Sequence, residues 1–351
     1  MRLRRMPWQP ESWTLASGPI ASAPLVLWQA HTQSVGIRGR LRTGLAVNLA
    51  QRLFGTEFQN PILLASGTCG YGEELAGVLE LDRLGGLVTK ALTTEPRPGN
   101  PAPRVAEFDA GMINSVGLAN VGLERFRAEK LPWLAAHLRH AQVLVNVAGK
   151  TVEEFADLIR SIDDDRGFLG YELNVSCPNV KEGGATFSSR PDLLAEVVRA
   201  ARAATRRPVI VKLAPNVPDI GHMAEVAVAE GADGLTLINT FPGMIIDTER
   251  RRPVIGAGSG GVSGPAILPM GVHAVWHARA RVDVPLIGAG GIRSGDDALQ
   301  YLMAGASLVQ IGTASFADPR TAQRVLTQLG QYGRKHDVSD IRELIGAARA
   351  D

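Results

Sequence analysis

The sequence has little cysteine, little net charge and no long apolar run. Two cysteines in 351 residues, Cys69 and Cys177, are too few for a disulfide framework, an iron-sulfur cluster or a structural zinc of their own. No stretch reaches the roughly 18 consecutive apolar residues of a membrane span, and a net charge of +2 gives no basic field for nucleic acid. The sequence therefore predicts a globular protein of the reducing cytoplasm, without nucleic-acid or membrane partners.

Residues 1–43 differ from the rest of the chain. They are rich in arginine and proline, and their longest apolar run, Leu25 to Trp28, is too short for a secretory signal. We expect a disordered extension here. Two alternatives stay open: a transit peptide, or a true translation start near residues 41–47. Residues 44–351 are expected to form one catalytic domain.

From Asn60 onward, short apolar runs alternate with longer amphipathic stretches, as in a parallel sheet with crossover helices. The expected strands are Ile62–Ala65, Gly86–Leu92, Val143–Val147, Tyr171–Val175, Val209–Ala214, Gly234–Asn239, Pro285–Ala289 and Ser307–Gly312. Eight strands are the number that closes a (β/α)8 TIM barrel, which is the predicted fold. We expect a helix over Thr151 to Ile162, and first-turn prolines at Pro191 and Pro218.

Two connections are unusually long, Thr93 to about Asn120 and Phe241 to Pro265. Both follow strand C-terminal ends, where barrel enzymes place their active sites, so we expect them to cover the site.

The segment Glu172 to Gly184, ELNVSCPNVKEGG, carries Cys177 from a strand end into a loop. A thiol there can act as base or nucleophile, whereas the alternative is a buried structural cysteine. The adjacent proline and the amide side chains of Asn174 and Asn179 favour a chemical role.

Polar residues end six of the predicted strands, which core packing alone does not explain. They are Ser66, Lys90, Asn146, Asn174, Lys212, and Asn239 with Thr240. Lysine is rarely buried without an anion, and an amide both donates and accepts hydrogen bonds. The pattern predicts a flat, polar, anionic ligand.

Glycines after the last two predicted strands indicate a phosphate site. They lie in Gly288–Ile292 and Gly312–Ala314, and Gly264 adds a further backbone donor. By contrast, the dinucleotide-like spacing of Gly256, Gly258 and Gly261 lacks the strand, turn and helix that NAD binding requires. Four other residues are expected to pack or to face solvent, without metal: Cys69, His222, His273 and His277.

Together these residues resemble class 1 dihydroorotate dehydrogenases from about Leu45 to Pro319. The motifs that carry the resemblance are ASGTCGYG from Ala65, TKALT from Thr89, NSVGLAN from Asn114, NVSCPNVKEGG from Asn174, VKLAPN from Val211, INT from Ile238, GGVSGPAI from Gly260 and GAGGI from Gly288. ASGT and VKEGG are most similar to the NAD-linked type B catalytic subunit, with the fumarate-linked type A enzyme as near neighbour. Cys69 departs from the family, which has an aromatic residue there.

The resemblance implies oxidation of (S)-dihydroorotate to orotate in de novo pyrimidine (UMP) biosynthesis, with one FMN per chain. Cys177 would remove the C5 proton while a hydride passes from C6 to flavin N5. The substrate residues would be Lys90, Asn114, Ser115, Val116, Gly117, Leu118, Asn174, Asn179, Asn239 and Thr240. The FMN residues would be Ser66, Lys90, Ala91, Asn146, Asn174, Lys212, Ile238, Gly264, Gly290, Gly291, Gly312 and Thr313. A thiol pKa of about 8.5 predicts activity that rises toward alkaline pH.

The type B resemblance also implies a partner subunit that carries FAD and a 2Fe-2S cluster and passes electrons to NAD. Two such pairs would form a heterotetramer built on a dimer of this chain. Three rival functions stay open: a dihydropyrimidine dehydrogenase-like subunit, a non-flavin phosphate-binding lyase or isomerase, and a non-catalytic binding module.

Overall fold

The computed structural model describes residues 47–176 and 187–349. The predicted extension over residues 1–43 lies outside them, as do Cys177 and Asn179 of the predicted active-site loop. Predictions about these residues stay predictions. In the described part of the chain, no helix combines the length and apolar character that crossing a bilayer requires.

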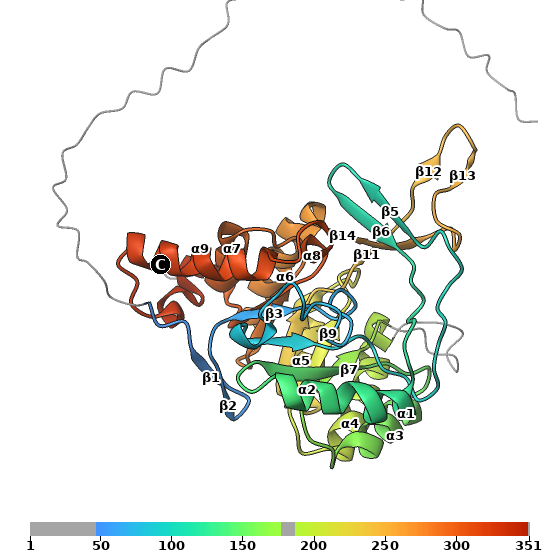
Figure 1. Cartoon of the computed structure of the whole chain (residues 1–351), viewed down its shortest axis with the longest axis horizontal. Coiled ribbons are helices and arrows are strands. Elements are labelled where there is room, and N and C mark those ends of the chain that lie inside the picture. The colour runs from blue at the N-terminus through green and yellow to red at the C-terminus, as the bar shows by residue number, and fades with distance from the viewer. Residues whose placement is uncertain (1–46, 177–186, 350–351) are drawn as a thin grey trace, which may run out of the picture. The chain divides into compact units, whose positions relative to one another are not determined.

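Eight parallel strands of the described residues close a barrel, in the spatial order β3-β4-β7-β8-β9-β10-β15-β16 and back to β3 (Figure 1). Their bounds are β3 Ile62–Leu64, β4 Gly86–Val88, β7 Gln142–Val147, β8 Gly170–Asn174, β9 Val209–Leu213, β10 Gly234–Leu237, β15 Leu286–Ala289 and β16 Leu308–Ile311. Each coincides with one predicted strand, although β4 is shorter than expected. The predicted (β/α)8 barrel is confirmed.

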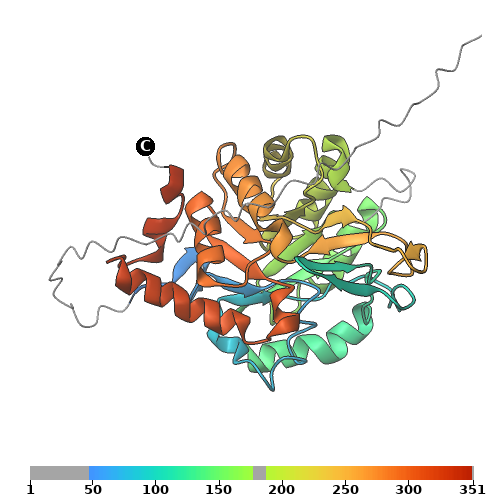
Figure 2. The ribbon, with the colours of Figure 1, turned by 90° about the horizontal axis from the view of Figure 1, so that it is seen from above.

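Helices pack around this barrel, as the view in Figure 2 shows. Their bounds are α1 Leu123–Arg125, α2 Leu131–His137, α3 Val152–Ile162, α4 Pro191–Ala204, α5 Ile220–Ala229, α6 Leu268–Arg279, α7 Gly295–Ala304, α8 Ala314–Ala317 and α9 Thr321–Lys335. The α3 prediction is confirmed: Thr151 caps the helix by accepting a hydrogen bond from the Glu154 N–H at 3.2 Å.

Pro191 occupies the first turn of α4, as predicted, but the prediction for Pro218 is wrong. Helix α5 begins at Ile220, after an N-cap at Asp219 whose carboxylate accepts from the His222 N–H at 3.0 Å. An aspartate satisfies the free N–H groups of a first turn, so the helix starts after the proline rather than on it.

The inside of the barrel has an apolar layer and, above it toward the strand C-termini, a polar layer. The apolar layer contains the fully buried Leu63, Val88, Leu144, Ile210, Ile287 and Leu308. Phe58 closes it from below; it belongs to β2 (Thr56–Phe58), which pairs with β1 (Gln51–Leu53). Because strand side chains alternate, the residue two positions beyond an inward-facing one also faces inward. This alternation places Asn146, Lys212 and Gln310 above Leu144, Ile210 and Leu308.

Both long connections contain strands that were not predicted. These are β5 Val105–Phe108, β6 Gly111–Asn114, β11 Phe241–Gly243, β12 Ile246–Asp247, β13 Arg252–Pro253 and β14 Gly260–Ser263. Four of them form one antiparallel sheet in the order β11-β14-β6-β5, which joins the two connections. Figures 1 and 2 both show this sheet on one side of the barrel.

Candidate active site

The predicted site residues that the structure describes lie at the C-terminal side of the barrel strands, in the added sheet, or just after a strand of that sheet. Asn146, Asn174 and Lys212 lie in the last residues of β7, β8 and β9, and others directly follow β3, β4, β10, β15 and β16. Asn114 ends β6 and Gly264 follows β14. One end of the barrel therefore gathers residues that are up to 247 positions apart, from Ser66 to Thr313.

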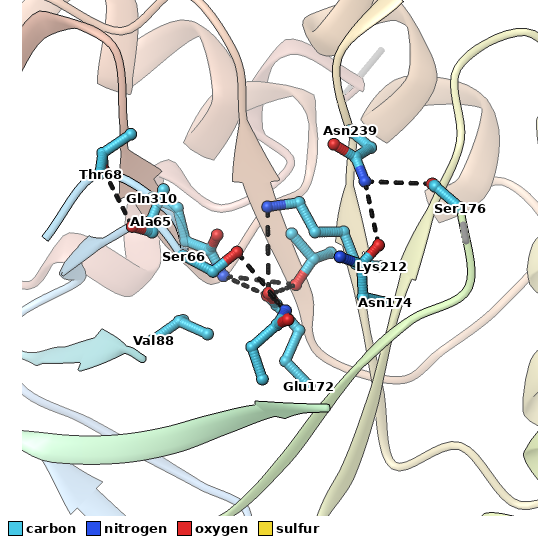
Figure 3. Close-up of polar contacts among 12 residues, drawn as sticks. Ala65, Ser66, Thr68, Val88, Glu172, Asn174, Ser176, Lys212, Asn239 and Gln310 are labelled. Atoms are coloured by element: carbon cyan, nitrogen blue, oxygen red, sulfur yellow. Dashed lines mark hydrogen bonds and ion pairs between the residues drawn. The ribbon is translucent and has the colours of Figure 1, made fainter. Parts of the chain in front are cut away.

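A buried carboxylate lies at the centre of the polar layer, and sequence reasoning did not select it. Glu172 is fully buried on β8. Its Oε1 accepts from Asn146 Nδ2 at 2.8 Å and lies 3.9 Å from Lys212 Nζ. Its Oε2 accepts from Thr236 Oγ1 at 2.8 Å and from Gln310 Nε2 at 2.6 Å. Figure 3 shows Lys212 and Gln310 converging on this carboxylate.

Lys212 therefore has an anionic partner within the protein itself, in addition to the anionic ligand that its position predicts. Its side chain is 8% exposed and that of Glu172 is 0% exposed, so each charge is removed from water. Burying an unpaired charge is very costly, whereas opposite charges offset each other in a low-dielectric interior. The pair lets this site keep a cation within its polar layer.

Two predicted substrate residues contact each other directly. Asn239 donates through Nδ2 to Ser176 Oγ at 3.0 Å and to Asn174 Oδ1 at 3.4 Å (Figure 3). Its own Oδ1 accepts from the Thr240 N–H at 2.8 Å. The end of β8, which leads into the predicted Cys177 loop, is thus tied to the end of β10.

Residues 114–118 are held by an asparagine that was not predicted. Asn100 Nδ2 donates to the Ser115 carbonyl at 3.0 Å and to Ser115 Oγ at 2.8 Å. Leu118 has a left-handed φ of 55°, a strained conformation for a leucine. Its side chain packs against the buried Ala91 and Ala148. Ala91 and Ala148 lie just after β4 and β7, so this contact brings the end of the predicted ring-binding segment to the barrel mouth.

The added sheet brings that segment to the second connection. Asn114 pairs with Gly261 in the β6–β14 register, and Asn114 Nδ2 donates to the Gly261 carbonyl at 3.3 Å. A side chain at Gly261 would meet Thr240 Oγ1 at 2.1 Å, so the glycine lets Thr240 approach the sheet closely. Asn114 and Thr240, predicted to frame one ligand, thus lie beside the same glycine.

The predicted phosphate loops meet a helix and the added sheet. Gly291 has a φ of +75°, which glycine adopts without strain. The buried hydroxyl of Tyr301 on α7 donates to the Gly290 carbonyl at 2.8 Å and the Ala289 carbonyl at 3.1 Å. Burial and, next, Asp297 raise the pKa of the Tyr301 phenol, which therefore stays a donor. Thr313 Oγ1 donates to Ser263 Oγ at 2.8 Å beside Gly264.

The tyrosine contact leads to a prediction for the loop. At the FMN site that the resemblance implies, Tyr301→Phe should weaken FMN binding by about fivefold, because a lost hydrogen bond of about 1 kcal/mol loosens the Gly290 backbone. Titration of apoprotein with FMN measures this change. Tyr332→Phe on α9 is the matched control, and equal affinities in the two variants would contradict a role for Tyr301 in the loop.

Lys90 lies beside a second cation that was not predicted. Burial and, next, the charge of Arg104 lower the pKa of the Lys90 ammonium. Arg104 is held by the carbonyls of Pro98 at 3.3 Å and Asn100 at 3.5 Å. Two neighbouring cations of this kind suit an anionic ligand.

Cys69 is a packed residue, as predicted. It is 1% exposed, and its Sγ lies 3.2 Å from the Val88 carbonyl and 3.5 Å from the Ala65 carbonyl. Burial and, next, the charge of Glu74 raise the pKa of the Cys69 thiol to about 12. A thiol with this pKa is almost entirely protonated at pH 8 and therefore unreactive.

This burial predicts slow alkylation. In the folded protein, iodoacetamide at pH 8 should label Cys69 at least tenfold more slowly than in urea, because labelling needs an exposed thiolate. Peptide mass spectrometry after timed quenching measures both rates. Equal rates in the two conditions would show that Cys69 is accessible.

The remaining sequence predictions concern residues away from the barrel mouth. His222 lies on α5, and His273 and His277 lie on α6, as expected. Gly256 and Gly258 lie between β13 and β14, outside any strand-turn-helix unit. Among the described residues no group of three His, Cys, Asp or Glu side chains has a metal-binding arrangement.

Known proteins resemble the chain over most of its length. A family model described as dihydroorotate dehydrogenase matches residues 48–332. The dihydroorotate dehydrogenase B (NAD(+)) catalytic subunit of Geotalea daltonii is 45% identical over 302 residues, which are 86% of this chain and 98% of that protein. The protein of the same name from Pelobacter propionicus is 47% identical over 88% of this chain and 99% of its own length.

A Solibacter usitatus protein with the provisional name dihydroorotate dehydrogenase A (fumarate) is 50% identical over 86% of this chain and 98% of its own length. Relatives named for both acceptors therefore match at similar identity and over nearly their whole length. The match of the family model and of these relatives, together with the barrel that it accompanies, shows that the chain belongs to the dihydroorotate dehydrogenase family.

Proposed function

We propose that the chain is the catalytic subunit of an NAD-linked dihydroorotate dehydrogenase that oxidises (S)-dihydroorotate to orotate in pyrimidine biosynthesis. The observation that carries the proposal is 45–47% identity to type B catalytic subunits over 86–88% of the chain. The site fits this reaction, because amides, cations and glycine loops gather at one end of the barrel.

FMN fits the polar layer because one buried hydrogen-bond acceptor there has no donor from the protein. The NH2 group of Asn146 donates a hydrogen bond to Glu172. The Oδ1 atom of Asn146 is buried without a hydrogen-bond partner in the described residues. A buried acceptor without a donor is costly unless a ligand supplies one, and a flavin ring carries an N–H on its edge. Bound FMN would supply a two-electron acceptor for the hydride that leaves dihydroorotate C6.

Three groups of residues would hold this cofactor. Lys212 and Asn146 would contact the ring, Gly290 and Gly291 would hold the phosphate with backbone N–H groups, and Gly312 with Thr313 would complete the phosphate site. The remaining cofactor contacts would come from Ser66, Lys90, Ala91, Asn174, Ile238 and Gly264.

The substrate would lie between the two connections and the strand ends. Lys90 would bind the carboxylate, and Asn114, Asn174 and Asn239 would bind the ring edge, which both donates and accepts. Ser115, Val116, Gly117, Leu118 and Thr240 would frame it, and Asn179 would contact it from the Cys177 loop. This assignment of Lys90 disfavours uracil and thymine as substrates, because neither carries a carboxylate.

Cys177 would act as the base. Its thiolate would take the proton from C5 while the hydride leaves C6, so that a C–C double bond forms in the ring. Asn239 supports this assignment, because it fixes Ser176, the residue before Cys177, at 3.0 Å.

Electrons would leave through a second subunit with FAD and a 2Fe-2S cluster, where NAD binds. We infer a heterotetramer of two such pairs in the cytoplasm. The fumarate-linked type A enzyme is the second candidate, and the Solibacter usitatus relative favours it at 50% identity.

Anaerobic mixing with dihydroorotate tests the proposal. Purified protein should show a yellow flavin spectrum that bleaches with dihydroorotate and does not respond to dihydrouracil. Reoxidation by fumarate at a catalytic rate would assign type A, whereas NAD reduction that requires the partner subunit would assign type B. A colourless protein, or a flavin that dihydroorotate leaves oxidised, would overturn the function and favour a phosphate-binding lyase or isomerase.

A further inference from the structure

The buried carboxylate of Glu172 has no part in the reaction proposed above, yet four side chains converge on it. Asn146, Thr236 and Gln310 donate hydrogen bonds of 2.6 to 2.8 Å, and Lys212 supplies a positive charge at 3.9 Å. Both carboxylate oxygens are acceptors in these contacts, and one of them faces the cation. Glu172 is therefore a fixed negative charge inside the barrel, directly under the strand ends.

Its first effect is on the direction of two amides. An ionised carboxylate only accepts hydrogen bonds, so Asn146 and Gln310 must both turn their NH2 groups toward it. The oxygen atoms of both amides, Asn146 Oδ1 and Gln310 Oε1, are then buried without a partner in the described residues. Glu172 thus leaves the Asn146 oxygen free to accept a hydrogen bond from a ligand.

Its second effect is electrostatic. Lys212, with 8% of its side chain exposed, favours an electron-rich ligand, and a carboxylate 3.9 Å away opposes that effect. Between buried groups this opposition is screened little by water or salt. The two charges together therefore set how strongly the site prefers a reduced flavin over an oxidised one.

We propose that Glu172 is a positioning residue that fixes the Asn146 amide and the Lys212 ammonium at the flavin site, and that its charge lowers the reduction potential of the flavin. This inference rests on the proposed flavin function. A purely structural role would change stability alone, whereas this role changes the balance between the two flavin states.

The test compares apoprotein dissociation constants for oxidised and dithionite-reduced FMN. In Glu172→Gln the preference for reduced FMN should increase at least tenfold, which for a two-electron couple is about 30 mV more positive. Glu172→Asp keeps the charge and should keep the wild-type ratio. Thr236→Val removes a hydrogen bond to the same carboxylate but no charge, so its ratio should change less than threefold.

An unchanged ratio in Glu172→Gln, or an equal change in Thr236→Val, would overturn the proposal. If Glu172→Gln does not fold, Lys212→Met is compared with Lys212→Met/Glu172→Gln, which lacks both charges. The double variant must then prefer reduced FMN more strongly than Lys212→Met does, and the reverse order overturns the proposal.

These measurements use no dihydroorotate. A wild-type flavin that dihydroorotate does not reduce would overturn the proposed reaction, while the ratios still decide the role of Glu172. A chain that binds no FMN would overturn both.

Discussion

Replacing Cys177 with alanine should slow dihydroorotate oxidation on the order of 100- to 10,000-fold, because the C5 proton loses its base. FMN should stay bound, since Cys177 is not among the cofactor residues proposed above. The reductive half-reaction, followed at the flavin band after anaerobic mixing, measures the loss directly. The pH profile of the unchanged protein should rise toward alkaline pH as the thiol ionises, with an ordinary thiol pKa of about 8.5.

Two cysteine variants act as controls. Cys69→Ala removes the other thiol, which the fold buries against the Ala65 and Val88 carbonyls, and should reduce the flavin at a rate near that of the unchanged protein. Cys177→Ser should regain part of the rate only at high pH, because a hydroxyl ionises less readily than a thiol. Full activity in Cys177→Ala would place the base on another residue.

The second large effect concerns stability. Lys212→Met should lower the free energy of unfolding by about 3 kcal/mol, since it leaves the fully buried Glu172 carboxylate without its cation. Lys212→Met/Glu172→Gln, which removes both charges, should recover at least half of that loss. Urea unfolding of the four proteins of this double-mutant cycle measures the coupling. Additive losses in the two single variants would mean that the charges do not interact.

The barrel was predictable because its evidence is local. Each strand is an apolar run, such as Val209–Leu213, and a polar residue at its end points to the side where ligands bind. All eight predicted strands are found in the barrel. The positions of Asn146, Asn174 and Lys212 at one end of it follow directly from the parallel topology.

The added sheet was not predictable in the same way. β14, with the sequence GGVS, is poor in strand-forming residues, and its partners β6 and β11 come from different connections. Its pairing depends on glycine, because a side chain at Gly260 would meet the Asn114 carbonyl at 2.3 Å. Such close approach between distant segments leaves no periodic pattern in either one.

Glu172, Thr236 and Gln310 were missed for another reason. They lie inside strands, whereas the sequence analysis selected polar residues only at strand ends. The alternation of side chains carries the signal that would have found them: Asn174 follows Glu172 by two residues, as Gln310 follows Leu308. In a small barrel every second residue faces a packed interior, so a polar residue in that phase must have partners there.

The sheet that joins β6 to β14 also limits how this enzyme can be re-engineered. Asn114 comes from the first connection and Gly261 from the second, and their backbones pair. Exchanging one connection for that of a relative would replace half of a hydrogen-bonded ladder and leave the other half with a foreign neighbour. A change of ring specificity would therefore require both connections to be exchanged together, although they are separate stretches of the sequence.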